Sequence, residues 1–110
     1  MAWKYKQLGQ AEGTTSAVSI LAMTAKELRV KLISISNHET TASTYNVWLD
    51  DDGTTYDDTT VMAEGIPIPP NDTLSWYVDW GMTVVGGNLA VKAGDASRLT
   101  FTVFGEEVEG

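Results

Sequence analysis

Apolar and polar residues alternate with a period of two along most of this 110-residue chain. In LRVKL, Leu28, Val30 and Leu32 fall on one side, and Arg29 and Lys31 fall on the other. An extended strand points successive side chains to opposite faces, so this alternation predicts β-strands. It also predicts strands in TYNVWLD, LSWYVDW and RLTFTVF, and weaker ones at 3–7, 17–23, 61–68, 82–85 and 89–93.

The alternation changes phase after Leu32, because Ile33 and Ile35 continue on the face that Arg29 and Lys31 began. A β-bulge or a strand buried on both faces would explain this change. We favour the bulge.

Turn residues separate the predicted strands at 52–53, 69–72, 86–88 and 94–95. About eight short strands at such spacing predict an antiparallel β-sandwich of jelly-roll or immunoglobulin-like type. A chain of 110 residues has room for one such core. We therefore expect residues 17–110 to form the sandwich and residues 1–16 to form an N-terminal arm and linker.

Composition argues against several classes of function. The net charge of -8 and the pI near 4.3 disfavour nucleic acid and membrane surfaces as partners, since both attract Lys and Arg. The chain has no cysteine, hence no disulfide, thiol nucleophile or thiolate metal site. It also lacks an apolar run of membrane-spanning length and a signal-peptide pattern, so we expect a soluble protein.

The stretch WLDDDGTTYDD, residues 48–58, holds five of the fifteen acidic residues. Asp50, Asp52, Asp57 and Asp58 could offer oxygen ligands to Ca²⁺, and Asp-x-Asp-Gly begins like an EF-hand loop. The loop pattern then fails, because Val61 stands where its last ligand, a Glu, belongs. We favour a hairpin tip in which Asp52-Gly53 supplies a positive φ.

Enzymatic constellations are scarce. The single histidine, His38, follows Asn37 in a predicted turn and has no nucleophile beside it. We therefore expect no enzyme, no catalytic residue and no cofactor.

The aromatic residues of WYVDW point to two faces. Trp76 and Trp80 share a face with apolar neighbours, which predicts core. Tyr77 and Trp48 lie on faces with polar neighbours, so they could meet on an outer surface and bind a sugar ring or a neighbouring subunit.

The first ten residues carry a second candidate for partner binding. The predicted arm alternates three apolar residues with two of the chain's seven basic ones, and an arm of that sign suits an acidic neighbour. Its candidate contacts are Trp3, Lys4, Tyr5, Lys6 and Leu8. We expect deletion of residues 1–10 to abolish attachment and to leave the sandwich folded.

Four segments in order carry a resemblance to a known group of proteins. They are WKYKQLGQ, LRVKLISISNHETTASTYNVWL, IPIPPNDTLSWYVDWGMTV and NLAVKAGDASRLTFTVFGEEVEG. In them the chain resembles small tailed-bacteriophage virion proteins, which share a Leu-Gly-Gln start and a Phe-Thr-x-Phe-Gly-x-Glu end. It departs from their pattern at Ala22-Met23 and at the acidic tip.

The resemblance implies a β-sandwich structural protein of the particle, without catalytic residues. We expect a capsid decoration or cement protein, located in the virion, that binds copies of itself, as a trimer, and the major capsid protein. The alternatives are a tail-fibre, collar or baseplate component and a carbohydrate-binding module.

Overall fold

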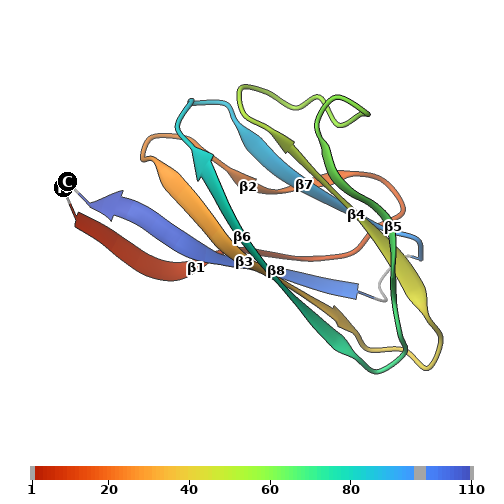
Figure 1. Cartoon of the computed structure of the whole chain (residues 1–110). Coiled ribbons are helices and arrows are strands. Elements are labelled where there is room, and N and C mark those ends of the chain that lie inside the picture. Colours follow the sequence, from red (N-terminus) through yellow and green to blue (C-terminus); the bar gives the residue numbers. More distant parts are fainter. Residues whose placement is uncertain (1, 96–98, 110) are drawn as a thin grey trace.

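The computed structural model describes residues 2–95 and 99–109, and these form two four-stranded antiparallel sheets packed face to face (Figure 1). The predicted all-β sandwich is therefore confirmed. No helix that could span a membrane is present in the described ranges. The strands are β1 (Ala2–Glu12), β2 (Val18–Ala22), β3 (Leu28–Asn37), β4 (Ser43–Asp50), β5 (Val61–Ile68), β6 (Thr73–Met82), β7 (Asn88–Ala93) and β8 (Leu99–Glu109).

The order of the strands decides between the two predicted sandwich types. Sheet A has the order β1-β8-β3-β6, and sheet B has the order β2-β7-β4-β5. The first strand thus pairs with the last, the second with the seventh, the third with the sixth and the fourth with the fifth. This nested pairing is one long hairpin wound into two sheets, which is the jelly roll. An immunoglobulin-like sandwich instead pairs several strands that are consecutive in the chain.

The core lies between the two sheets and consists of the inward residues of the alternating strands. Tyr45 of β4 meets Phe101 of β8 edge to face, with ring centroids 6.3 Å apart. Each large apolar side chain buried in this way stabilises the fold by roughly 1.5–3 kcal/mol. The largest fully buried side chains are Phe101, Ile33, Ile35, Ile68, Met82, Leu89 and Leu99.

The predicted bulge is present in β3, but one residue earlier than the sequence pattern placed it. The register with β6 and with β8 shifts between Val30 and Leu32. Leu32 therefore faces outward, paired with Tyr77 and with Phe104, and not inward beside Val30 as predicted. A bulge turns two neighbouring residues to one face, which the alternation alone could not locate.

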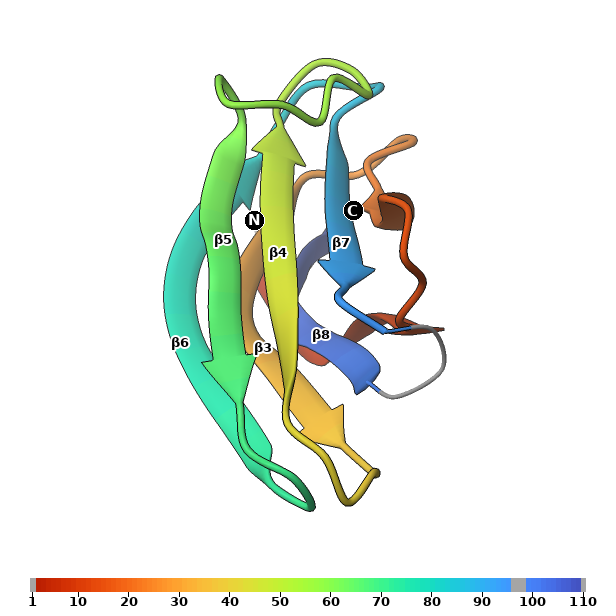
Figure 2. The ribbon, with the colours of Figure 1, turned by 90° about the vertical axis from the view of Figure 1, so that its right-hand side faces the viewer.

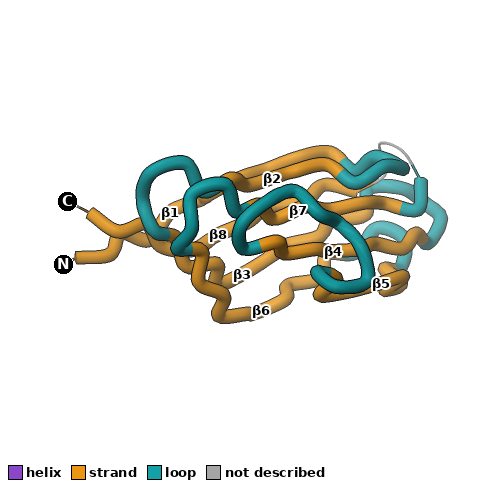
Figure 3. The backbone as a smooth tube through the Cα atoms, turned by 90° about the horizontal axis from the view of Figure 1, so that it is seen from above, coloured by secondary structure: helices purple, strands orange, loops and turns teal. Residues whose placement is uncertain are grey.

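The N-terminal segment is part of the sandwich, which corrects the predicted division into an arm and a sandwich. Ala2–Glu12 pairs with β8 along its whole length, so the described part of residues 1–16 is mostly an edge strand of sheet A. Figure 3 shows β1 and β8 running together to the end where both termini lie. Met1 and Gly110 lie outside the described residues. The alternation in β1 is typical of a strand, and each residue paired in its register has a partner that lies 88 or more positions away in the chain.

Residues 82–85 were predicted to form a weak strand, and this prediction is wrong. β6 continues to Met82, and the chain then turns through residues 83–87 to reach β7. This loop lies beside the 51–60 loop (Figure 2), and the side chain of Asn88 joins them by donating to the carbonyl oxygens of Gly53 (3.1 Å) and Gly86 (2.7 Å).

Candidate interaction surface

The acidic stretch connects β4 to β5, which confirms the hairpin interpretation. Asp50 is only 6% exposed, and its carboxylate accepts hydrogen bonds from the backbone N–H of Thr55 (2.7 Å) and of Asp52 (3.3 Å). These backbone donors hold the pKa of Asp50 below its ordinary value. Hydrogen bonds to the Asp50 carboxylate therefore stabilise this turn. The positive φ at Gly53 that the sequence suggested is absent, because the described residues with a positive φ are Gly65, Asn71 and Gly86.

The four predicted Ca²⁺ ligands do not gather at one point. Carboxylate oxygens of Asp50, Asp51 and Asp52 lie within 4.8 Å of one another. Asp57 makes a separate turn, in which its Oδ1 accepts from the N–H (2.8 Å) and the hydroxyl (2.6 Å) of Thr59. The side-chain hydrogen bond between Asp52 and Asp50, together with the charges of Asp50 and Asp51, raises the pKa of Asp52, as expected for carboxylates forced together.

Trp48 does not share a surface with Tyr77, which corrects the predicted aromatic pair. Trp48 is only 8% exposed, because the 51–60 loop folds back over β4 and lays Tyr56 against it, with ring centroids 6.3 Å apart. Tyr77 is 77% exposed and lies on β6 in the other sheet. The two residues therefore cannot flank one sugar ring.

On the outer face of sheet A, a row of cross-strand partners crosses all four strands, and its members in β8, β3 and β6 form an apolar row. Gln7, Phe104, Leu32 and Tyr77 are consecutive cross-strand partners in β1, β8, β3 and β6. Residues paired in this way lie side by side on one face. The alternation in the sequence predicts Leu32 on the same face as Val30 and gives no sign that Phe104 lies near Tyr77. Only the register of the strands brings Leu32 and Phe104 beside Tyr77.

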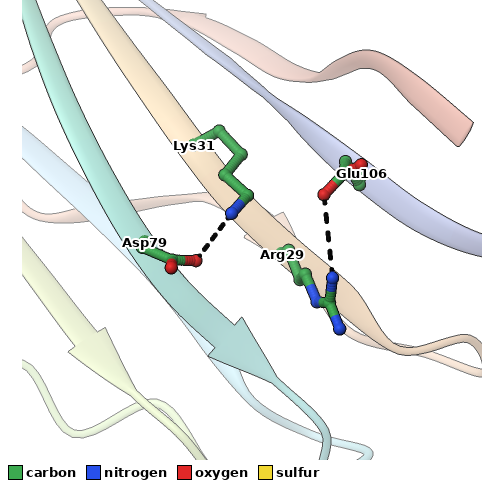
Figure 4. A network of polar contacts seen from close by, with 4 residues as sticks. All are labelled: Arg29, Lys31, Asp79 and Glu106. Atoms are coloured by element: carbon green, nitrogen blue, oxygen red, sulfur yellow. Dashed lines mark hydrogen bonds and ion pairs between the residues drawn. The ribbon is translucent and has the colours of Figure 1, made fainter. Parts of the chain in front are cut away.

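Charged groups follow the apolar row toward the termini. The ammonium of Lys31 donates to Asp79 at 2.8 Å, and Arg29 lies 3.9 Å from Glu106 (Figure 4). The hydrogen bond from Lys31 and its charge hold the pKa of Asp79 below the ordinary range. The guanidinium of Arg29 also lies 3.9 Å from the centroid of the Trp3 ring.

We define the outer patch as this neighbouring set on sheet A. Its charged members are two cations and two anions, so the patch is neutral, whereas the whole chain carries -8. Like-charge repulsion between copies is therefore weaker at the outer patch than the net charge of the whole chain would suggest. The members of the outer patch are Trp3, Tyr5, Leu32, Tyr77, Phe104, Val108, Arg29, Lys31, Asp79 and Glu106.

The predicted contacts of the N-terminal arm are divided by the alternation of β1. Trp3 and Tyr5 face outward with Val108 and Glu106, their partners on β8. Lys4 and Lys6 take the other face, where Lys6 lies 3.6 Å from Glu107. Leu8 packs against the core.

The described residues contain no pocket. The imidazole Nε2 of His38 lies 2.6 Å from the hydroxyl of Thr100, on the surface.

No protein-family model matches this chain, and no curated protein is similar to it in sequence. Among solved structures, the coat protein dimer of Tobacco streak virus is similar in fold at 12% identity and a TM-score of 0.43, covering 99% of this chain and 86% of that chain.

Proposed function

We propose that this protein is a structural protein of a bacteriophage particle, a capsid decoration protein that binds the assembled head lattice. The observation that carries the proposal is the outer patch, which has no net charge and is rich in aromatic and apolar side chains, on an acidic chain. The resemblance of four ordered segments to small phage virion proteins supports the choice of particle.

The mechanism is linkage. A protein that binds the assembled lattice and not its free subunits stabilises the lattice by mass action. Repetition over symmetry-related sites multiplies a modest contact. Self-association belongs to this function, and a trimer would suit three-fold lattice positions.

Immunogold electron microscopy of particles from the source culture tests the location. Label over heads supports decoration of the capsid. Label confined to the neck or tail favours a tail-fibre, collar or baseplate component, which would use the same fold. Absence of label from every particle would overturn the proposal.

A pair of variants tests the outer patch itself. We expect Trp3→Ala with Tyr5→Ala to reduce occupancy on particles by tenfold or more, as loss of aromatic anchors does at about 2 kcal/mol. Val85→Ala is the matched control, because Val85 is 64% exposed but lies in the 83–87 loop, outside the patch. Equal occupancy of both variants would remove the patch from the mechanism.

The carbohydrate-binding alternative has lost its structural support. It required Trp48 and Tyr77 on one surface, and Trp48 is buried in the other sheet. We do not propose it.

A further inference from the structure

We propose that the free edge of β6 pairs antiparallel with β6 of a second copy, so that the two sheets A become one continuous sheet. This inference deepens the proposed function, on whose self-association it rests, by naming the surface where copies meet. Sheet A leaves β1 and β6 as its edges, and sheet B leaves β2 and β5.

The other three edges carry features that hinder pairing with another strand. β1 has a register shift at Gly9, where a Cβ would clash with the carbonyl oxygen of Ile20 on β2. β2 is five residues long and has a register shift between Ser19 and Leu21. β5 has two register shifts, a positive φ of 61° at Gly65, and Pro67, which has no N–H to donate. Bulges, short strands and proline are the usual protections of a sheet edge.

β6 has none of these protections along its first half. It is ten residues long and contains no proline, lysine or arginine. Residues 73–77 pair with β3 in unbroken register. Its single charge, Asp79, is matched by Lys31 at 2.8 Å. The register shift with β3 falls beyond this stretch, between Tyr77 and Trp80. Residues 73–77 therefore form an edge without bulge, proline or charge, which presents its free N–H and C=O groups to another strand.

The inner face of β6 is incompletely covered. Trp76 and Trp80 contact each other edge to face, with centroids 5.2 Å apart and planes at 90°, and both remain partly exposed. The inward residues Ile33 of β3 and Phe101 of β8 are fully buried. A strand added beside β6 would place same-face side chains within about 5.5 Å of the tryptophans and cover them.

The chemistry of this edge selects a second copy as its occupant. Each copy carries -8, yet β6 with its Lys31 partner is neutral, so two copies can approach here against little local repulsion. A strand that pairs with its own copy does so about a two-fold axis, which gives a dimer. A trimer would have to form through another surface.

Single cysteines test the contact, because the chain has none of its own. We expect an intermolecular disulfide under mild oxidation in one of three samples: Ser75→Cys alone, Tyr77→Cys alone, or an equal mixture of the two variants. Which sample forms the disulfide depends on which residue lies on the two-fold axis. Ser34→Cys is the matched control, since Ser34 lies opposite Ser75 on β3, on the same face. Because β3 lies one strand further from the two-fold axis than β6, the two copies of residue 34 are about 10 Å further apart than the two copies of residue 75. That distance exceeds the limit of roughly 6.8 Å between the Cα atoms of a disulfide.

The mass of the wild-type protein is measured alongside, by sedimentation from about 1 µM to about 1 mM. The expected mass doubles, and tryptophan emission shifts to shorter wavelength as Trp76 and Trp80 are covered. A monomer throughout, a three-chain mass without cross-linking at β6, or a stronger cross-link at Ser34 would overturn the edge pairing.

These measurements use purified protein and need no particles. If these measurements overturn the pairing at β6 while gold label still covers phage heads, the proposed function stands without this contact. If the protein forms the β6 dimer but no particle is labelled, the edge pairing stands and the proposed function is overturned.

Discussion

Gly105 of β8 and Gly81 of β6 differ in how closely other atoms of the protein approach them. A Cβ on Gly105 would clash with the carbonyl oxygen of Arg29 and approach the side chain of Leu8 to 2.9 Å. A Cβ on Gly81 would meet nothing within 4 Å. Gly105 therefore allows β3 and β8 to approach closely at the bulge, and Gly81 has no such role.

Gly105→Ala should destabilise the protein by about 1–3 kcal/mol, as overpacking does. Gly81→Ala should instead be neutral or stabilise by up to about 1 kcal/mol, because alanine restricts the unfolded chain. Urea unfolding followed by circular dichroism gives both free energies. Equal effects would mean that the close approach at Gly105 relaxes without cost.

Ionisation of the Asp50 carboxylate makes the stability of the protein depend on pH. Backbone hydrogen bonds from Thr55 and Asp52 lower its pKa in the folded state, so its ionised form contributes stability above the unfolded value of about 3.9. That contribution is lost as pH falls through the lower, folded-state pKa. Asp52 acts in the opposite sense, because its pKa is raised by Asp50 and Asp51.

Asp50→Asn retains an acceptor oxygen and removes the titration. We expect its free energy of unfolding to fall less steeply than that of the wild type between about pH 4 and about pH 2. Thr54→Ser, an exposed change in the same loop that removes no titrating group, should keep the wild-type slope. Parallel curves for Asp50→Asn and the wild type would show that the Asp50 hydrogen bonds do not govern acid stability.

At the scale of elements, β1 is a structural strand as well as part of the outer patch. It pairs with β8 from Ala2 to Glu12 and packs Leu8 against the core. Without it, β8 would become an edge, and its backbone groups would lose their partners. The expectation that residues 1–10 can be removed from a folded sandwich is therefore replaced by the opposite one.

Deletion of residues 1–10 should lower the midpoint of thermal unfolding or prevent folding, which circular dichroism would detect. Deletion of Met1 and Ala2 alone is the control, since it leaves the paired strand nearly whole. An unchanged midpoint after the longer deletion would restore the interpretation as a detachable arm.

At the scale of the whole molecule, the net negative charge lies outside the two surfaces that we propose for contact. The chain carries -8, and the outer patch and the β6 edge are locally neutral. Long-range repulsion between copies is screened by salt, whereas strand pairing and burial of tryptophan are not weakened in the same way.

Self-association should therefore strengthen as ionic strength rises from about 0.02 M to about 0.5 M, where the screening length falls from about 20 Å to about 4 Å. Sedimentation at a fixed protein concentration measures the change. Weaker association at high salt would indicate that opposite charges, and not the neutral edge, hold copies together.

The candidate site was only partly predictable from the sequence. The alternation in the sequence predicted Tyr77 on an outward face, and the structure agrees. Trp3 and Tyr5 were predicted as contacts of a free arm, and they lie instead on the outer face of an edge strand. It could not reveal that Leu32 and Phe104 join them, because that depends on a bulge and on pairing between strands distant in the chain. It also could not reveal that Tyr56 would cover Trp48.

The sequence by itself determined the all-β class, most of the strands and the turn between β4 and β5, because alternation and turn chemistry act between near neighbours in the chain. Only the tertiary structure decided the jelly-roll order, the place of β1 and which edges stay free. Those features depend on pairing between segments such as Ala2–Glu12 and Leu99–Glu109, and a period of two is compatible with any partner strand.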